Sequence, residues 1–192
     1  SLIRMNISSN PIRDYSGLLK MTKLQKLSIA FSYFKKVPEE VLGLKNLEQL
    51  FLNDNKNLID ISAVRDLPNL IYIRIDGSGL DSLPDSFATL VNLTHAVLND
   101  NLGLKNLKIL GELKFLKVLK LSNCNLEKLP HKLKNLDSLI VLNLTRNPSL
   151  KEFSVLLELD KLKTLYLYKS EFITELEVAK LRAKLTNCDV YY

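Results

Sequence analysis

The sequence predicts an α/β solenoid, a curved stack of short repeats that share one parallel β-sheet. The first observation is a leucine pattern, L-x-x-L-x-L-x-x-N, that recurs along all 192 residues. Its copies, numbered here as repeats 1 to 8, begin at Leu2, Leu24, Leu47, Leu70, Leu93, Leu116, Leu139 and Leu162. The first step is 22 residues and every later step is 23. A fixed period of this length indicates a repeat architecture, so we expect residues 1–192 to form a single domain.

The second observation is the alternation of apolar and variable residues inside each copy. Segments such as Leu50-Phe51-Leu52 and Leu142-Asn143-Leu144 have the period of two that is typical of a β-strand. One copy cannot bury its leucines alone. Stacked copies pair their strands at about 4.8 Å and share a core, so each repeat is stabilised by its neighbours.

The motif and its period resemble those of the leucine-rich repeat family over essentially the whole chain. The resemblance implies a curved horseshoe, with parallel strands on the concave face and short helices or 3₁₀ turns on the convex face. It also implies that the Asn at the ninth motif position points inward and bonds the backbone of adjacent copies. In this chain that position alternates, so we expect a weaker ladder at every second rung. It reads Asn10, Ser32, Asn55, Ser78, Asn101, Cys124, Asn147 and Ser170.

Proline shows the same alternation. Val37-Pro38, Leu83-Pro84 and Leu129-Pro130 lie 46 residues apart, so the true unit is a pair of unlike repeats. Because proline suits the first turn of a helix, we expect these copies to start a short convex helix there, with looser turns or 3₁₀ segments in the others. Copies of 23 residues with this proline resemble those of bacterial leucine-rich repeat proteins, which favours a bacterial source.

The two ends of the chain differ. We expect a C-terminal cap over residues 171–192, because Thr174-Glu175-Leu176-Glu177 has the pattern of a capping box that opens a helix through about Leu185. Leu176, Ala179 and Leu181 are expected to face the last repeat, and an edge strand follows at Cys188 to Val190. The first motif starts at residue 2 without a cap. We therefore expect the natural chain to continue upstream, or a partner or self-association to cover this edge.

Catalytic, metal and membrane functions find little support in the sequence. His95 and His131 are expected on opposite faces, and Cys124 and Cys188 in buried positions too far apart to form a disulfide. We expect no catalytic residues, no metal and no cofactor. Asp54, Asp76 and Asp100 follow three consecutive strands; a calcium site is the alternative to a polar loop edge, which we favour because six ligands are lacking. No apolar run is long enough to span a membrane.

The variable strand positions between the leucines face outward on the concave sheet, and two clusters stand out there. Aromatic residues and arginine contribute much of the energy at protein interfaces, which makes these clusters candidate binding patches. The concave patch comprises Phe51, Tyr72, Arg74, His95, Val97 and Lys120. The secondary patch comprises Tyr166, Tyr168 and Tyr191.

These observations predict a protein–protein interaction module that holds a protein or peptide ligand on its concave face, centred on Phe51, Tyr72 and Arg74. The alternative is a structural or assembly role through the N-terminal edge or a flank. A weaker alternative is binding of nucleic acid or an anionic surface, because 27 basic against 21 acidic residues give a net charge of +6. The basic residues are scattered, however, so nucleic acid is not favoured. A bacterial secreted or cell-surface location is favoured over the cytoplasm.

Overall fold

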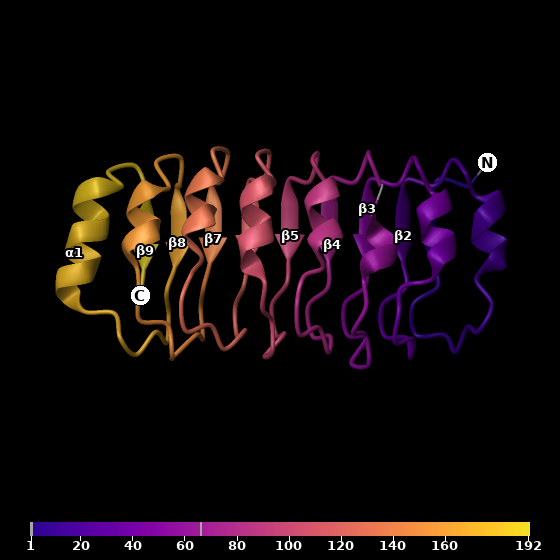
Figure 1. The fold of residues 1–192 in the computed structure, drawn as a ribbon, viewed down its shortest axis with the longest axis horizontal. Coiled ribbons are helices and arrows are strands. Elements are labelled where there is room, and N and C mark those ends of the chain that lie inside the picture. Colours follow the sequence, from indigo (N-terminus) through magenta and orange to yellow (C-terminus); the bar gives the residue numbers. More distant parts are fainter. Residues whose placement is uncertain (1, 66) are drawn as a thin grey trace.

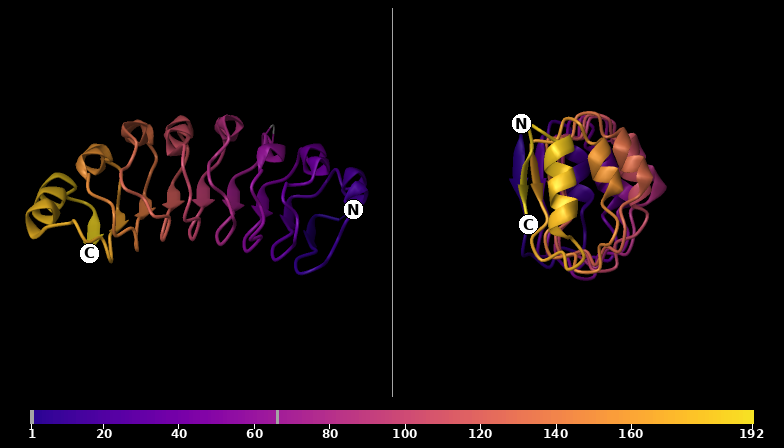
Figure 2. Two further views of the ribbon diagram at one scale, coloured as in Figure 1. Left: turned by 60° about the horizontal axis from the view of Figure 1, so that its bottom comes forward. Right: turned by 90° about the vertical axis from the view of Figure 1, so that its left-hand side faces the viewer.

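The chain forms one curved solenoid with a single parallel sheet along its inner side. The computed structural model describes residues 2–65 and 67–192. Nine strands of three residues each pair in chain order; Figure 1 shows the strands side by side along the chain, and Figure 2 shows them on the concave side of an arch. The strands are β1 (Arg4–Asn6), β2 (Lys26–Ser28), β3 (Gln49–Phe51), β4 (Tyr72–Arg74), β5 (His95–Val97), β6 (Val118–Lys120), β7 (Val141–Asn143), β8 (Thr164–Tyr166) and β9 (Asp189–Tyr191). The predicted horseshoe and its concave sheet are confirmed.

Short 3₁₀ helices form the convex side of the arch (Figure 2). They are η1 (Ser16–Lys20), η2 (Glu39–Gly43), η3 (Ser62–Val64), η4 (Asp85–Thr89), η5 (Leu107–Glu112), η6 (His131–Asn135) and η7 (Ser154–Glu158). The expected contrast between proline and non-proline copies is wrong, since both kinds form 3₁₀ helices. Each proline immediately precedes its helix, and its carbonyl accepts the first i+3 hydrogen bond, as Pro38 does from the amide of Val41 at 3.1 Å. Segments this short favour 3₁₀ over α-helical bonding.

The motif leucines form one continuous core between the sheet and the 3₁₀ helices. Leu24, Leu47, Leu50, Leu70 and Leu93 are fully buried. The strands pair in the predicted register, without a slip from one end to the other, because shifting one strand by a residue would turn all of its leucines into solvent. The side chains between the leucines therefore lie in straight rows on the concave face.

The C-terminal end is closed by α1 (Glu175–Lys184) and then β9. The capping box is present: the Thr174 hydroxyl accepts from the amide of Glu177 at 3.2 Å, and the amide of Thr174 donates to the Glu177 carboxylate at 3.3 Å. The predicted inner face of the helix is partly wrong. Leu176 and Ala179 are exposed, because the apolar stripe has a different phase, with spacings of three and four residues. That stripe comprises Val178, Leu181 and Leu185.

Asparagine at the ninth motif position ties the repeats together in pairs. The side chain of Asn147 in repeat 7 donates to the carbonyls of Leu121 and Leu144 at 2.8 Å, and it accepts from the amides of Cys124 and Leu126 at 3.1 Å. Three of these four groups belong to repeat 6. Asn55 bonds repeat 2 and Asn101 bonds repeat 4 in the same manner.

The same pairs are joined a second time, by isolated parallel bridges beyond the sheet. These bridges pair Lys36 with Asp60, Ser82 with Lys105, and Lys128 with Glu152. We call the contacts between repeats 2 and 3, 4 and 5, and 6 and 7 the asparagine joints. The contacts between repeats 3 and 4, 5 and 6, and 7 and 8 are the small-residue joints, since Ser78, Cys124 and Ser170 stand at their ninth positions. Within residues 2–65 and 67–192, the small-residue joints have no such bridge.

A second asparagine ladder, which we did not predict, lies at the edge where the strands begin. Each of its side-chain amides donates to a backbone carbonyl of the preceding repeat. Asn46 donates to Thr22 at 2.7 Å, Asn69 to Lys45 at 2.9 Å, and Asn92 to Pro68 at 2.7 Å. The ladder ends at Phe115, which takes the next position and is exposed. These bonds are solvent-exposed and contribute less than the buried rungs.

Candidate binding surface

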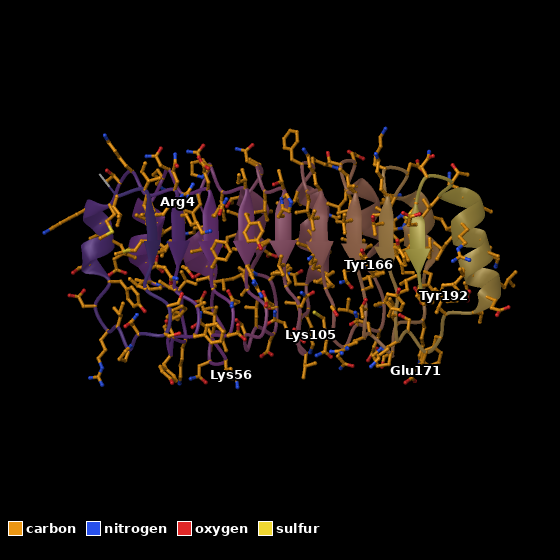
Figure 3. All side chains as sticks on the ribbon, turned by 180° about the vertical axis from the view of Figure 1, so that it is seen from behind. Arg4, Lys56, Lys105, Tyr166, Glu171 and Tyr192 are labelled. Atoms are coloured by element: carbon orange, nitrogen blue, oxygen red, sulfur yellow. The ribbon has the colours of Figure 1, made fainter. Side chains whose placement is uncertain are left out.

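The concave face presents the two predicted clusters on one continuous sheet surface. Strand pairing places Tyr72 between Gln49 and His95, and Arg74 between Phe51 and Val97. In Figure 3, which views the sheet from its concave side, Arg4 and Tyr166 lie towards opposite ends of that surface. The two clusters are thus separated along the solenoid, with β7 between them.

Three rings form what we call the aromatic column across β3, β4 and β5. The centroids of Phe51 and Tyr72 lie 5.2 Å apart, and those of Tyr72 and His95 lie 5.8 Å apart, each pair tilted by 31°. The ammonium group of Lys26 lies 4.7 Å from the centre of the Phe51 ring, a cation–π contact. All three rings are half-buried, so part of each side chain remains exposed to solvent on the concave face.

Arg74 and Val97 depart from what we expected of the concave patch. The guanidinium of Arg74 donates to the carboxylate of Asp76 at 2.6 and 2.9 Å, and this hydrogen bond raises the pKa of Arg74. Arg74 stays positively charged, and the carboxylate of Asp76 already balances that charge. Val97 was expected to be exposed but is buried, because its neighbours in the row, Arg74 and Lys120, carry much longer side chains. Neither residue is a free anchor for a ligand.

Partial burial and nearby positive charges favour the neutral form of His95. Partial burial lowers its pKa below the ordinary value of 6.5, and the positive charges of Lys117 and Lys120 lower it further. The ring nitrogen Nδ1 lies 2.8 Å from the hydroxyl of Thr94. At neutral pH the imidazole therefore behaves as a planar, uncharged end of the aromatic column.

A hollow at the N-terminal end of the concave face was not predicted. It has a volume of about 400 Å³ and is lined by Arg4, Met5, Asn6, Lys26, Ser28 and Phe51. Arg4 and Lys26 supply two positive charges. Within the described residues neither of them forms an ion pair with a carboxylate. Strand pairing places Arg4 beside Lys26 and Lys26 beside Gln49, so both cations lie next to the aromatic column.

The secondary patch of Tyr166, Tyr168 and Tyr191 is a cluster of three neighbouring rings, which we call the tyrosine patch. The centroids of Tyr166 and Tyr191 lie 5.1 Å apart at 14°, and that of Tyr168 lies 6.5 Å and 6.4 Å from them, inclined by 30° and 32°. Tyr168 and Tyr191 are exposed, with relative accessibilities of 44% and 40%. Nearby, the Arg182 guanidinium lies 5.3 Å from the centre of the Tyr192 ring. This patch packs the last strands together as well as presenting a surface.

The cysteines are not arranged for chemistry. Both are free; Cys124 is buried, as expected, whereas Cys188 is only half-buried, which corrects its predicted burial at the chain's edge strand. Loss of solvation raises the pKa of each thiol to about 11. Thiols with such values are poor nucleophiles at neutral pH.

Metal-binding and membrane-spanning features are not seen in the part of the chain that the structure describes. Its acidic, histidine and cysteine side chains form no group of three that could hold a metal ion. The carboxylate of Asp76 binds Arg74, and those of Asp54 and Asp100 accept from Asn53 and Asn123 at 2.7 and 2.8 Å. No helix among the described residues is long and apolar enough to cross a bilayer.

Several solved structures share this architecture. The leucine-rich repeat domain of the type III effector XopL is 22% identical, with a TM-score of 0.82 over 99% of this chain and 68% of that one. Internalin C2 from Listeria monocytogenes is 23% identical, with a TM-score of 0.72 over 86% of this chain and 71% of that one. The plant peptide hormone receptor RGFR1, in complex with RGF2, is 21% identical, with a TM-score of 0.63 over 87% of this chain and 28% of that one.

At these identities the similarity shows the fold alone. No protein-family model matches the sequence, and no curated protein sequence is similar to it. The assignment therefore rests on the eight copies of the motif and on the shared architecture. Together they show that the chain has the leucine-rich repeat fold.

Proposed function

We propose that this protein is a binding module that holds a protein or peptide ligand on its concave face. The observation that carries the proposal is the aromatic column of Phe51, Tyr72 and His95, three adjacent and partly exposed rings on a preformed sheet. Aromatic side chains bury much area for few lost rotamers. A rigid surface also needs little reorganisation on binding.

The charges beside the column favour a particular ligand. A planar or apolar side chain of the ligand lies against the rings, and an acidic group reaches the hollow with Arg4 and Lys26 at the N-terminal end. From the sequence, we placed Arg74 at the centre of the site. Its guanidinium is already bound to Asp76, so we assign it a structural role instead. The ligand-binding centre thus lies closer to β3 than the sequence suggested.

The comparisons support a binding role in general terms. One similar structure is a peptide hormone receptor in complex with its ligand, and others are an internalin and a type III effector domain. Leucine-rich repeats host many unrelated tasks, so the fold does not name the partner. The internalin and the effector domain are consistent with our proposal of a bacterial protein that is secreted or held at the cell surface.

The decisive experiment captures a partner with the purified chain and then measures its affinity for variants. The double variant Phe51→Ala/Tyr72→Ala removes two rings from the column. We expect it to bind at least about a hundredfold more weakly, because central aromatic anchors each contribute about 2 kcal/mol or more. Titration calorimetry measures the affinity, and circular dichroism verifies that the variant is folded.

The matched control is Tyr166→Ala/Tyr168→Ala, which removes two rings from the other end of the same face. This control should retain the affinity to within about threefold. Equal binding by all three proteins would reject the concave column and leave the edges or flanks as the site. A loss of nearly one logarithmic unit of affinity per phosphate contact for each tenfold rise in salt would instead support nucleic acid.

A further inference from the structure

A second hollow lies outside the concave face, between repeats 5 and 6. We propose that it is a separate binding site for an acidic peptide segment that carries an apolar anchor residue. It has a volume of about 510 Å³ and is lined by residues 102–108, 124–128 and Pro130. We call it the flank hollow. Its volume falls in the range of about 300–1,000 Å³ that is typical of ligand pockets.

The flank hollow lies at a small-residue joint, where fewer backbone bonds hold the two repeats together. At the asparagine joints, the segments that follow the strands are held together by backbone bonds, as between Lys105 and Asp81 at 2.7 Å. In the described residues, no backbone hydrogen bond joins residues 102–108 to residues 124–130. The two repeats nevertheless meet on the convex side, where Lys132 forms an ion pair with Glu112 at 2.9 Å. The gap is therefore closed on one side and open on the other.

A comparison with repeats 3 and 4 gives one reason for the gap between repeats 5 and 6. There Gly79 lies so close to the backbone that an added Cβ would sit 2.5 Å from the carbonyl oxygen of Lys56. Only glycine permits that approach. The same position in repeat 6 is Asn125, which has a side chain and a left-handed backbone with φ of 52°. Repeats 5 and 6 cannot close as tightly along this segment.

The floor of the flank hollow is apolar. Leu104, Leu107, Leu126 and Cys124 form it and are almost completely buried. At its lip, the side chain of Leu102 is 63% exposed, which is unusual for a leucine in this solenoid. A leucine-like side chain in the hollow would remove Leu102 from water, and this burial is the source of the binding energy for an apolar anchor.

The rim is positively charged. Lys105, Lys108 and Lys128 are all exposed, and within residues 2–65 and 67–192 none of them is paired with a carboxylate. Glu127 is the only acidic residue of the lining. Charge complementarity therefore selects acidic residues on either side of the anchor. Figure 3 places Lys105 at the long edge of the solenoid, where an extended chain can approach without crossing the concave face.

Backbone NMR of the whole chain tests this with three blocked hexapeptides. The probe has two central leucines flanked on each side by two glutamates. One control peptide has lysines in place of the glutamates, and the other has serines in place of the leucines. We expect the probe to shift amide signals of residues 102–108 and 124–128, and both control peptides to leave them unchanged. Shifts confined to the concave strands, no shifts, or equal shifts from a control peptide would overturn the proposal.

Protein variants sharpen the same titration. Lys105→Glu/Lys128→Glu reverses the rim charge and should weaken the probe about tenfold or more, because like charges then face each other. Leu102→Ser should weaken it about threefold by removing the apolar lip. The control Lys35→Glu/Lys56→Glu changes the net charge equally at the same edge of repeats 2 and 3, and should have no effect. If that control weakened binding equally, the effect would come from the net charge of the protein, and a defined site at the flank hollow would be rejected.

Discussion

The asparagine joints and the small-residue joints use the same motif position in different ways. At an asparagine joint, one buried side chain serves several backbone groups on both sides, as Asn147 does for repeats 6 and 7. At a small-residue joint, Ser78 or Cys124 only adds a second contact to a carbonyl. The Ser78 hydroxyl lies 3.4 Å from the carbonyl oxygen of Leu52, which already accepts from Asn55 at 2.7 Å.

This difference teaches that the structural unit is a pair of repeats. The isolated bridges join the same pairs as the asparagines do, so both devices strengthen alternate contacts. The stability of a solenoid is approximately a sum of repeat and neighbour terms. Two kinds of joint therefore predict two levels of local stability along one chain, and the flank hollow lies at one of the weaker contacts.

Removing an asparagine should have the largest effect. Asn147→Ala leaves the buried amides of Cys124 and Leu126 without an acceptor. We expect the free energy of unfolding to fall by about 3 kcal/mol, since each unsatisfied buried group costs about 1–3 kcal/mol and water offsets part of the loss. Urea unfolding monitored by circular dichroism measures it.

The control for this substitution is Asn69→Ala in the exposed ladder. Its side chain makes one bond, to the carbonyl of Lys45, and water can replace it. We expect a loss of about 0.5 kcal/mol or less. If both variants lost the same stability, the buried rungs would not be the elements that join the pairs.

The thiol of Cys124 reports on the opening of a small-residue joint. Burial raises its pKa to about 11, so the closed protein should react slowly with a disulfide reagent. If the joint opens to react, the thiol titrates with its ordinary pKa, and the labelling rate should level off above about pH 8.5. A rate that keeps rising towards pH 11 would show direct reaction of the closed state. The variant Cys188→Ser isolates this signal.

The sequence predicts the fold well because the leucine period is regular and each strand has one buried side. The register of all nine strands follows from that alternation alone. The sequence predicted only part of the pairing of repeats. The alternation at the ninth position predicted a weaker ladder, but the bridges of Lys36 and Ser82 depend on how segments outside the motif approach each other in space.

The candidate site was predicted less completely. The rows of the concave face placed Phe51, Tyr72 and His95 side by side, as the ring contacts show. Burial of Val97 depends on the lengths of its neighbours across strands, and motif positions do not encode that. The exposure of Leu176 was predicted wrongly, because the apolar residues of a ten-residue helix can form more than one stripe along it.

The smallest effect should come from a small-residue rung. Ser78→Ala removes a hydroxyl whose bond to the Leu52 carbonyl is long, and that carbonyl keeps its bond to Asn55. No buried group loses its last partner, so we expect the free energy of unfolding to change by about 0.5 kcal/mol or less. The same urea titration measures it. A loss close to that of Asn147→Ala would mean that serine holds repeats 3 and 4 as firmly as asparagine holds repeats 6 and 7. The alternation of asparagine with smaller residues at the ninth motif position would then not produce an alternation in local stability. The pairs of repeats would differ in their hydrogen bonds and bridges but not in their stability.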